Sequence, residues 1–161
     1  MKLGFIGMRD VRLARRFASV GIHVLAASVT AAERDARIVV LDGAVAVAQA
    51  LAAPRVIFLD LPDGFTTELA IADVWPECDA GDVVIDLGPG TPDDARRRAA
   101  ALASVRMHFV DAHASEQGLV LGGSAEAIRV TSGYLDLAGA WAHRGPSGSG
   151  YHARLEAGDV A

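Results

Sequence analysis

Three side chains at alternate positions of one segment carry groups that nucleophilic and acid–base catalysis uses. Asp111, His113 and Ser115 supply a carboxylate, an imidazole and a hydroxyl. If the segment is extended, residues two apart point to the same side of it, so these groups lie in a row and do not face one another. The pattern makes the three residues one candidate set for non-redox catalysis. It predicts no metal site, because no third ligand follows Asp111 and His113 at a recognisable spacing.

The first sixteen residues indicate a different chemistry, the binding of an anion. An apolar run over residues 3–6 is too short for a helix, and Gly7 ends it before a helical pattern begins at Arg9. A strand, a tight turn and a helix in this order bind the pyrophosphate of a dinucleotide when the turn reads Gly-x-Gly-x-x-Gly. In this chain the three glycine positions are occupied by Gly7, Arg9 and Arg12.

The two arginines change what this turn is expected to bind. A side chain at Arg9 intrudes where the backbone should approach the pyrophosphate, and a bulky residue at Arg12 is expected to push the helix away from the strand. We therefore predict that the affinity for NAD or NADP falls sharply. The alternative is that Arg9 and Arg12 themselves hold an anion at the helix N-terminus.

The composition restricts the class of protein. With 161 residues and a hydrophobic fraction of 52%, the chain fits one domain with a well-developed core. A net charge of −5 argues against nucleic acid or an anionic membrane as a partner held by charge. The single cysteine, Cys78, excludes an internal disulfide and is expected to be a partly buried structural thiol. No segment is built like a membrane span or a signal peptide, so we expect a cytoplasmic protein.

Short apolar runs alternate with helical patterns along most of the chain. The runs 55–61 and 82–87 are almost entirely apolar, as central strands covered on both faces should be. The alternation predicts βαβ units and a Rossmann-like α/β fold, with a doubly wound, mainly parallel sheet of about six to eight strands and helices on both faces. The expected strands are 3–6, 22–27, 37–41, 55–61, 82–87, 107–110, 119–121 and 140–143, and the expected helices are 9–20, 30–36, 44–51, 64–75, 92–103 and one that begins at Ser124.

Charged side chains gather where these strands end, which is the usual ligand crevice of a doubly wound sheet. Asp60 stands out because it interrupts an apolar strand. One interpretation is that Arg9 and Arg12 pair with carboxylates at this edge and fill the crevice from within, and the equal alternative is that each charge is solvated at the rim of the sheet. The three arginines at 96–98 are expected to form a solvated helix face.

Six motifs occur along the chain in a characteristic order. They are GFIG (4–7), LPDG (61–64), VIDLG (84–88), DDARRR (93–98), HFVDA (108–112) and GPSGSGYHARL (145–155). The ordered set resembles the 6-phosphogluconate dehydrogenase and β-hydroxyacid dehydrogenase family over nearly the whole chain.

The resemblance implies an N-terminal domain that binds NAD or NADP, a long interdomain helix, and a helical C-terminal domain that dimerises and completes the active site. It predicts a Rossmann-like domain over residues 1–144 and a stub of the interdomain helix over 145–161. Since the sequence ends at Ala161, we expect the helical domain to be absent. The strand near Ala140 and the segment 151–155 would then leave an apolar patch, which predicts a homodimer or a complex with another pathway protein.

The positions that select the cofactor in this family are altered. At the end of the second strand, the family has an acid for NAD or an arginine for NADP, and this chain has Ser28. Arg34 follows shortly after and is the candidate for contact with an adenosine phosphate. The cofactor-binding candidates are therefore Gly7, Arg9, Arg12, Ser28 and Arg34.

The residues that perform the family's reaction are altered as well. Pro89 stands for the asparagine near the nicotinamide, and of the substrate-binding serine and two glycines only Ser115 remains. The lysine that exchanges a proton matches Arg154, whose guanidinium stays charged near neutral pH and cannot do so. The asparagine one helical turn later matches Gly158.

These departures favour a diverged relative that no longer transfers hydride and acts as a binding or accessory protein. One alternative is an NADP-dependent oxidoreductase that completes its site by dimerisation, with Arg9 or Arg34 on a phosphate and Ser115 on the substrate. The other is a non-redox enzyme that uses Asp111, His113 and Ser115 in the old cofactor crevice.

Overall fold

The computed structural model describes residues 1–30 and 35–158, and eight strands within these ranges form one sheet. The strands are β1 (Lys2–Ile6), β2 (His23–Ala27), β3 (Ile38–Val40), β4 (Val56–Leu59), β5 (Val83–Asp86), β6 (His108–Ser115), β7 (Gly118–Gly122) and β8 (Trp141–Gly145). Their order across the sheet is β3-β2-β1-β4-β5-β6-β7-β8. Neighbouring strands are parallel except β6 and β7, which form an antiparallel hairpin.

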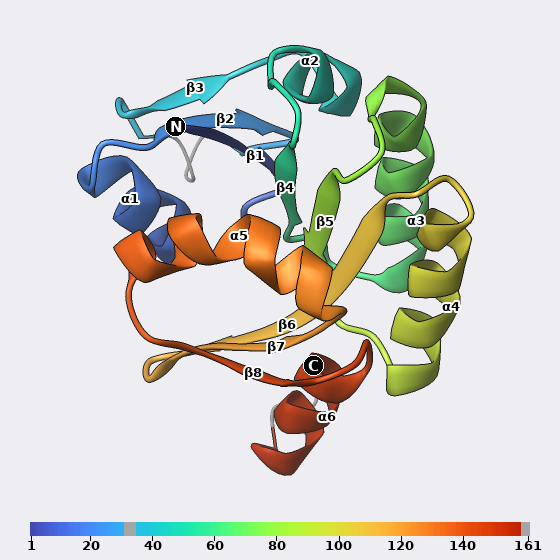
Figure 1. The fold of residues 1–161 in the computed structure, drawn as a ribbon. Helices are drawn as coiled ribbons and strands as arrows, with labels where there is room; N and C mark the ends of the chain where they lie inside the picture. Colours follow the sequence, from blue (N-terminus) through green and yellow to red (C-terminus); the bar gives the residue numbers. More distant parts are fainter. Residues whose placement is uncertain (31–34, 159–161) are drawn as a thin grey trace.

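Helices cover both faces of this sheet (Figure 1). They are α1 (Val11–Ser19), α2 (Ala44–Gln49), α3 (Gly64–Val74), α4 (Pro92–Ala103), α5 (Ala125–Ala138) and α6 (Ser149–Glu156), with a 3-10 turn, η2 (Trp75–Glu77), after α3. α1 and α5 share a hydrophobic cluster on one face, and α2, α3, α4 and α6 share another on the opposite face. None of the helices in the described ranges is long and apolar enough to cross a bilayer.

The core consists of these two clusters, one on each side of the sheet. On the first face, the rings of Phe5 and Phe58 stack with centroids 4.9 Å apart, and Phe17 of α1 packs against both. On the second face, Val74 of α3 and Tyr151 of α6 are completely buried. The two layers bury both faces of β1, β4 and β5, which explains why the central strands read as continuous apolar runs.

The predicted Rossmann-like α/β fold is confirmed, and the differences are local. All four residues of β4 are buried, as its apolar sequence predicted. β6 runs on to Ser115, past its predicted end at residue 110, because it pairs with β7, where Ala112 lies opposite Leu121. The predicted helix 30–36 lies largely outside the described residues.

The structure corrects one expectation about the surface and narrows another. Arg98 is only 3% exposed and donates to the buried carboxylate of Asp86 at 3.0 Å, so the arginine run is not a uniformly solvated face. Tyr151 is completely buried in the second cluster, so within the segment 151–155 it is Leu155, 47% exposed, that remains at the surface. The division of the chain between residues 144 and 145 stays a prediction.

Candidate functional site

A small cavity, which we call the crevice, lies at the carboxyl edge of the sheet. Its walls come from the turn after β1, from the residues that follow β4 and β5, from β6 and from α6, and its volume is about 250 Å³. This is the edge at which doubly wound sheets bind their ligands. The lining residues are Arg9, Asp10, Leu13, Asp60, Leu87, His113, Ala114 and Arg154.

Gly7 forms the tight turn between β1 and α1. Its φ of +72° lies in the left-handed region, and a Cβ at this position would lie 2.5 Å from the carbonyl oxygen of Asp60. Its N–H donates to the carbonyl of Ala27 at 2.9 Å, which continues the pairing of β1 with β2. Gly7 therefore keeps the role that a first fingerprint glycine has, because only glycine fits this approach of two strand ends.

The carboxylate of Asp60 is bonded to the turn on both of its oxygens. Oδ2 accepts the backbone N–H of Asp10 at 2.8 Å, and Oδ1 accepts Nε–H of Arg9 at 3.1 Å. The Asp60 side chain is 5% exposed and the Arg9 side chain 43%. Backbone N–H groups at this turn are the ones that contact phosphate in dinucleotide-binding domains. In this chain, one of them is already occupied by an internal anion, and the predicted pairing of Arg9 with a carboxylate of the edge is confirmed.

Arg12 lies outside this arrangement. Its guanidinium pairs with the side chain of Asp10 at 2.7 Å and is 74% exposed, so it does not pair across the crevice as predicted. Asp10 also caps α1 by accepting the N–H of Arg12 at 2.9 Å, and the hydrogen bond from the Arg12 side chain lowers the pKa of Asp10 below its usual value. α1 packs on the sheet through Ala14 and Phe17, and the displacement expected from a bulky residue at Arg12 stays a prediction.

The remaining cofactor candidates lie on or beyond β2. Ser28 follows β2 directly, is exposed and has a left-handed φ of 57°. Its hydroxyl thus lies at the strand end where the family has its ribose-reading residue. Arg34 lies outside the described residues.

Arg154 connects α6 to the sheet across the mouth of the crevice. Its guanidinium donates to the carbonyl oxygens of Leu87 at 2.7 Å and Ala112 at 3.1 Å, and to that of Gly88. Leu87 and Gly88 directly follow β5, and Ala112 lies on β6. The guanidinium also lies 5.6 Å from the centre of the Tyr151 ring. The residue at the family's lysine position is therefore a cross-link between main-chain segments.

Asp111, His113 and Ser115 all lie on β6, where Asp111 and Ser115 hydrogen-bond to main-chain groups, and a catalytic role of the three together stays a prediction. Asp111 is completely buried, and its two oxygens accept the N–H groups of Gly148 at 2.6 Å and Tyr151 at 2.8 Å. Burial raises the pKa of Asp111, and these N–H groups oppose that shift because they favour the charged form. Ser115 is engaged in the β6–β7 turn, where its hydroxyl donates to the carbonyl of Gly118 at 3.3 Å. His113 lines the crevice.

Behind the crevice lies a buried polar cluster that the sequence did not reveal. Asp86 accepts a hydrogen bond from the hydroxyl of Tyr151, one from Arg98 at 3.0 Å and one from the N–H of Gly88 at 2.7 Å. Arg98 also donates to Glu68 at 2.8 Å. Burial raises the pKa of Tyr151, which keeps its hydroxyl as a donor. The only sequence signal for this cluster was Asp86 at the end of an apolar strand, since its partners lie on distant elements.

The described residues contain neither a group of side chains suited to a metal ion nor an activated thiol. Over residues 1–30 and 35–158, no three His, Cys, Asp or Glu side chains are placed to hold a metal ion. Cys78 is partly buried, as predicted, and burial raises the pKa of its thiol to about 12. At neutral pH this thiol is therefore protonated and a poor nucleophile.

Solved structures share this fold although their sequences are distant. The 3-hydroxyisobutyrate dehydrogenase of Mycobacterium tuberculosis, solved with L-serine, matches 97% of this chain with a TM-score of 0.82 at 21% identity. An imine reductase of Myxococcus stipitatus in complex with NADP+ matches 98% with a TM-score of 0.81 at 17% identity. The 6-phosphogluconate dehydrogenase of Plasmodium falciparum matches 96% with a TM-score of 0.83 at 18% identity. At these identities the likeness establishes the fold alone.

The chain spans 58%, 59% and 39% of the lengths of these three proteins, in the order given. No curated protein matches its sequence. The sequence profile of one family, the NAD binding domain of 6-phosphogluconate dehydrogenase, matches residues 2–140. The resemblance predicted from the six motifs is thereby confirmed, and the chain belongs to the family of the NAD-binding domain of 6-phosphogluconate dehydrogenase.

Proposed function

We propose that this chain is a binding or accessory protein that keeps the fold of its family, has lost most of the affinity for NAD and NADP, and transfers no hydride. The observation that carries the proposal is the position of the Asp60 carboxylate. It accepts the N–H of Asp10 at 2.8 Å, at the turn where the family binds pyrophosphate. A phosphate would have to displace this carboxylate or lie against its negative charge.

Arg9 strengthens this argument. Its side chain occupies the second glycine position and is held over the turn by Asp60 at 3.1 Å. The crevice that remains measures about 250 Å³, below the roughly 300–1,000 Å³ of typical ligand pockets. A cavity of this volume holds a small molecule or one part of a larger molecule.

The residue at the family's proton-transferring lysine position, Arg154, supports the loss of hydride transfer. Arg154 stays charged near neutral pH, and its guanidinium donates to carbonyl oxygens of Leu87, just after β5, and of Ala112 on β6. A group that cannot release its proton does not serve as the acid and base of an alcohol oxidation.

Calorimetric titration with NADPH and with NADH tests the proposal. The titration is run at low salt, so that weak phosphate contacts are not screened. We expect no saturable binding of either nucleotide up to millimolar concentration. Micromolar binding of either one by the unmodified protein would overturn the proposal.

The double variant Arg9→Gly/Asp60→Ala tests the reason for the loss. It restores glycine at the second fingerprint position and removes the acceptor from the Asp10 N–H, so NADPH binding should become measurable. Circular dichroism confirms that the variant is folded. A folded variant that binds no better than the unmodified protein would show that the Arg9–Asp60 pair is not what prevents binding.

The second candidate is an NADP-dependent oxidoreductase of hydroxyacid or 6-phosphogluconate type that completes its site by dimerisation. Membership of the family favours it, and the imine reductase of Myxococcus stipitatus was solved in complex with NADP+. In that function Arg9 would hold a phosphate and Ser115 the substrate. NADPH binding by the unmodified protein that is lost in Arg9→Gln would favour this candidate over the first.

An accessory role requires a partner, and we propose a homodimer or a complex with a pathway protein. Three large apolar side chains on and after α3 are exposed, namely Phe65 (73%), Leu69 (50%) and Trp75 (44%). Such side chains are typical of interaction surfaces when they cluster. Light scattering that shows a clean monomer at high concentration would exclude the homodimer.

A further inference from the structure

Two neighbouring helices, α3 and α4, present apolar side chains on one face of the molecule, which we call the α3–α4 face. The helices lie side by side (Figure 1), and Arg97 of α4 pairs with Glu68 of α3 at 2.9 Å. Phe65 and Leu69 are exposed and form a ridge on α3, because residues four apart are neighbours on a helix surface. Beside the ridge, toward the ends of both helices, lies an apolar hollow of about 390 Å³. Its lining residues are Glu68, Ile71, Ala72, Trp75, Ala101, Leu102, Ser104 and Val105.

The ridge and the hollow complement each other, but they lie too far apart to meet within one chain. Phe65 lies near the start of α3 and Trp75 directly after its end, so about 15 Å of helix separates them. A two-fold axis through the middle of α3 places the ridge of one copy in the hollow of the other, and the reverse at the same time. Ala72 lies close to this axis, and its small side chain lets the two α3 helices approach each other.

The charges of the two helices favour the same pairing. The segment 64–77 contains three acids and no basic residue, whereas the segment 92–106 contains four arginines and two acids. In the two-fold arrangement, the acidic segment of one copy lies against the basic segment of the other. Complementary charges of this kind orient two partners and disfavour other pairings.

One ion pair across the interface follows from the register. Asp73 follows Phe65 by eight residues on α3, and Arg97 precedes Val105 by the same number. When Phe65 lies over the partner's Val105, with the two α3 helices antiparallel, Asp73 comes level with the partner's Arg97. The Arg97 side chain is 58% exposed, and its guanidinium has enough donors to bind this second carboxylate while it keeps Glu68.

The exposed apolar area fits a dimer of ordinary size. The ridge and the two large side chains at the hollow, Trp75 and Val105, leave roughly 400 Å² of apolar surface exposed on each copy. A stable interface buries about 800 Å² per partner, of which somewhat more than half is apolar. The α3–α4 face therefore supplies most of the apolar surface that such an interface needs.

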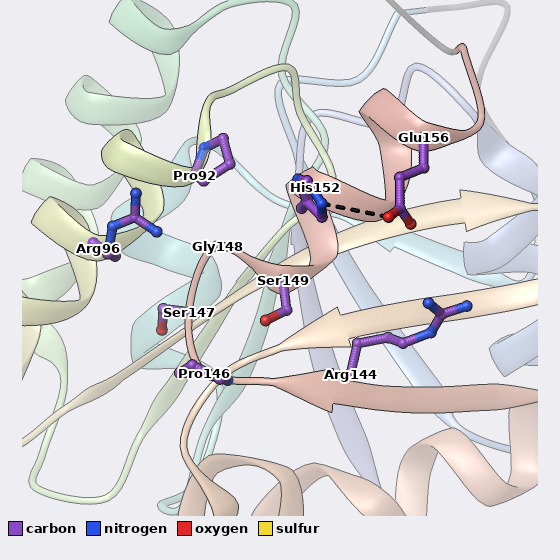
Figure 2. Close-up of a pocket in the computed structure, with 9 residues that line it drawn as sticks. All are labelled: Pro92, Arg96, Arg144, Pro146, Ser147, Gly148, Ser149, His152 and Glu156. Carbon is purple, nitrogen blue, oxygen red and sulfur yellow. Dashed lines mark ion pairs between the residues drawn. The ribbon is translucent and has the colours of Figure 1, made fainter.

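The hollow at the start of α6 offers no comparable surface. Its volume is about 460 Å³, and charged and polar side chains line most of it. Figure 2 shows Arg96 and Arg144 on opposite sides of α6, so their guanidinium groups do not converge on one ligand.

We propose that the α3–α4 face binds a second copy of this chain in a two-fold dimer, with the ridge of each copy in the hollow of the other. The inference rests on the accessory role proposed above, and it names the partner that this role requires.

Light scattering of the full chain after gel filtration, at about 1–100 μM, tests the proposal. We expect the mass of a dimer. Leu69→Glu places an unpaired carboxylate inside the interface and should weaken the dimer about a hundredfold or more. The matched control is Leu137→Glu on α5, on the opposite face of the sheet, since Leu137 is 46% exposed and Leu69 is 50% exposed. The control should remain a dimer, and circular dichroism shows that both variants are folded. A monomer at all concentrations, or equal weakening by the two variants, would overturn the proposal.

Charge reversal tests the register. Asp73→Arg and Arg97→Asp should each weaken the dimer about tenfold, because each places like charges opposite each other. The double variant should recover most of the affinity, since the reversed pair forms again across the interface. Misfolding cannot produce such a recovery. A double variant that dimerises no better than the single variants would refute the proposed pairing.

The nucleotide titrations separate this inference from the proposed function. A monomer that binds no NADPH would overturn the dimer and leave the loss of cofactor binding intact. A dimer that depends on Leu69 supports the interface whatever the titrations show.

Discussion

Replacing Arg154 by lysine should destabilise the protein, although lysine is the residue that the family has at this position. In the structure, the guanidinium bridges three carbonyl oxygens, those of Leu87, Gly88 and Ala112. A planar fork with five donors can reach all three at once. An ammonium group on a flexible stem is a point charge and satisfies fewer of them from one position.

The size of the effect follows from the bonds that are lost. A hydrogen bond to a charged group contributes about 1.5–3 kcal/mol, and the lower end applies here because the Arg154 side chain is only partly buried. If lysine keeps one of the three bonds, water compensates part of the loss of the other two. We therefore expect Arg154→Lys to lower the free energy of unfolding by about 2 kcal/mol. For a chain of this length, that corresponds to a fall of about 4–8 °C in the melting temperature.

Urea unfolding followed by tryptophan fluorescence measures this difference. Trp141 lies on β8, next to the loop that leads into α6, and Trp75 lies after α3 on the other side of the molecule. The control is Arg129→Lys, an exposed surface pair for which we expect a change within about 0.5 kcal/mol. An Arg154→Lys variant as stable as its control would refute the conclusion that this side chain cross-links α6 to the sheet.

Two further predictions concern one buried carboxylate, Asp111, and one surface carboxylate, Asp94. Asp111→Asn replaces one of the two oxygens that accept the α6 N–H groups by a donor, so it should lower the free energy of unfolding by about 1–3 kcal/mol. Because α6 is then held less firmly, trypsin cleavage after Arg154, measured by mass spectrometry, should be faster. Asp94 closes the cap of α4 with Thr91, and the hydrogen bond from the Thr91 hydroxyl lowers its pKa below the usual 3.8. Its contribution to stability is therefore present above the unfolded value of about 3.8 and is lost as the pH falls through the lower folded value. Asp94→Asn should flatten the pH dependence of urea unfolding below about pH 3.8, and an unchanged slope would contradict this.

The fold could be predicted because its central strands carry their own signal. The apolar runs that became β4 and β5 are buried on both faces, and periodicity identifies such strands without further information. The end of β6 could not be found in this way. Its extension to Ser115 depends on pairing with β7, a tertiary contact that the local sequence of residues 111–115 does not encode.

The candidate site was predictable where an unusual residue marked it. Asp60 interrupts an apolar run, and its pairing with Arg9 followed from charge and strand order. The roles of Arg154 and Asp111 were not predictable, because both depend on α6 folding back onto β6, more than thirty residues away in the sequence. The burial of Arg98 was not predictable for a related reason. Arg96 and Arg97 are exposed, as predicted for this run, and only Arg98 faces the buried Asp86.

The internal carboxylates explain how this domain can be stable without a ligand at its helix ends. A helix N-terminus that binds phosphate exposes N–H groups that remain without a protein partner until the ligand arrives. In this chain, Asp60 takes the N–H of Asp10 before α1, and Asp111 takes those of Gly148 and Tyr151 at the start of α6. Both carboxylates are nearly or completely buried, so they are fixed parts of the fold and not exchangeable surface groups. The chain thus satisfies an N–H group of the β1–α1 turn with its own carboxylate, and titration of the Arg9→Gly/Asp60→Ala variant with NADPH measures how far this arrangement prevents cofactor binding.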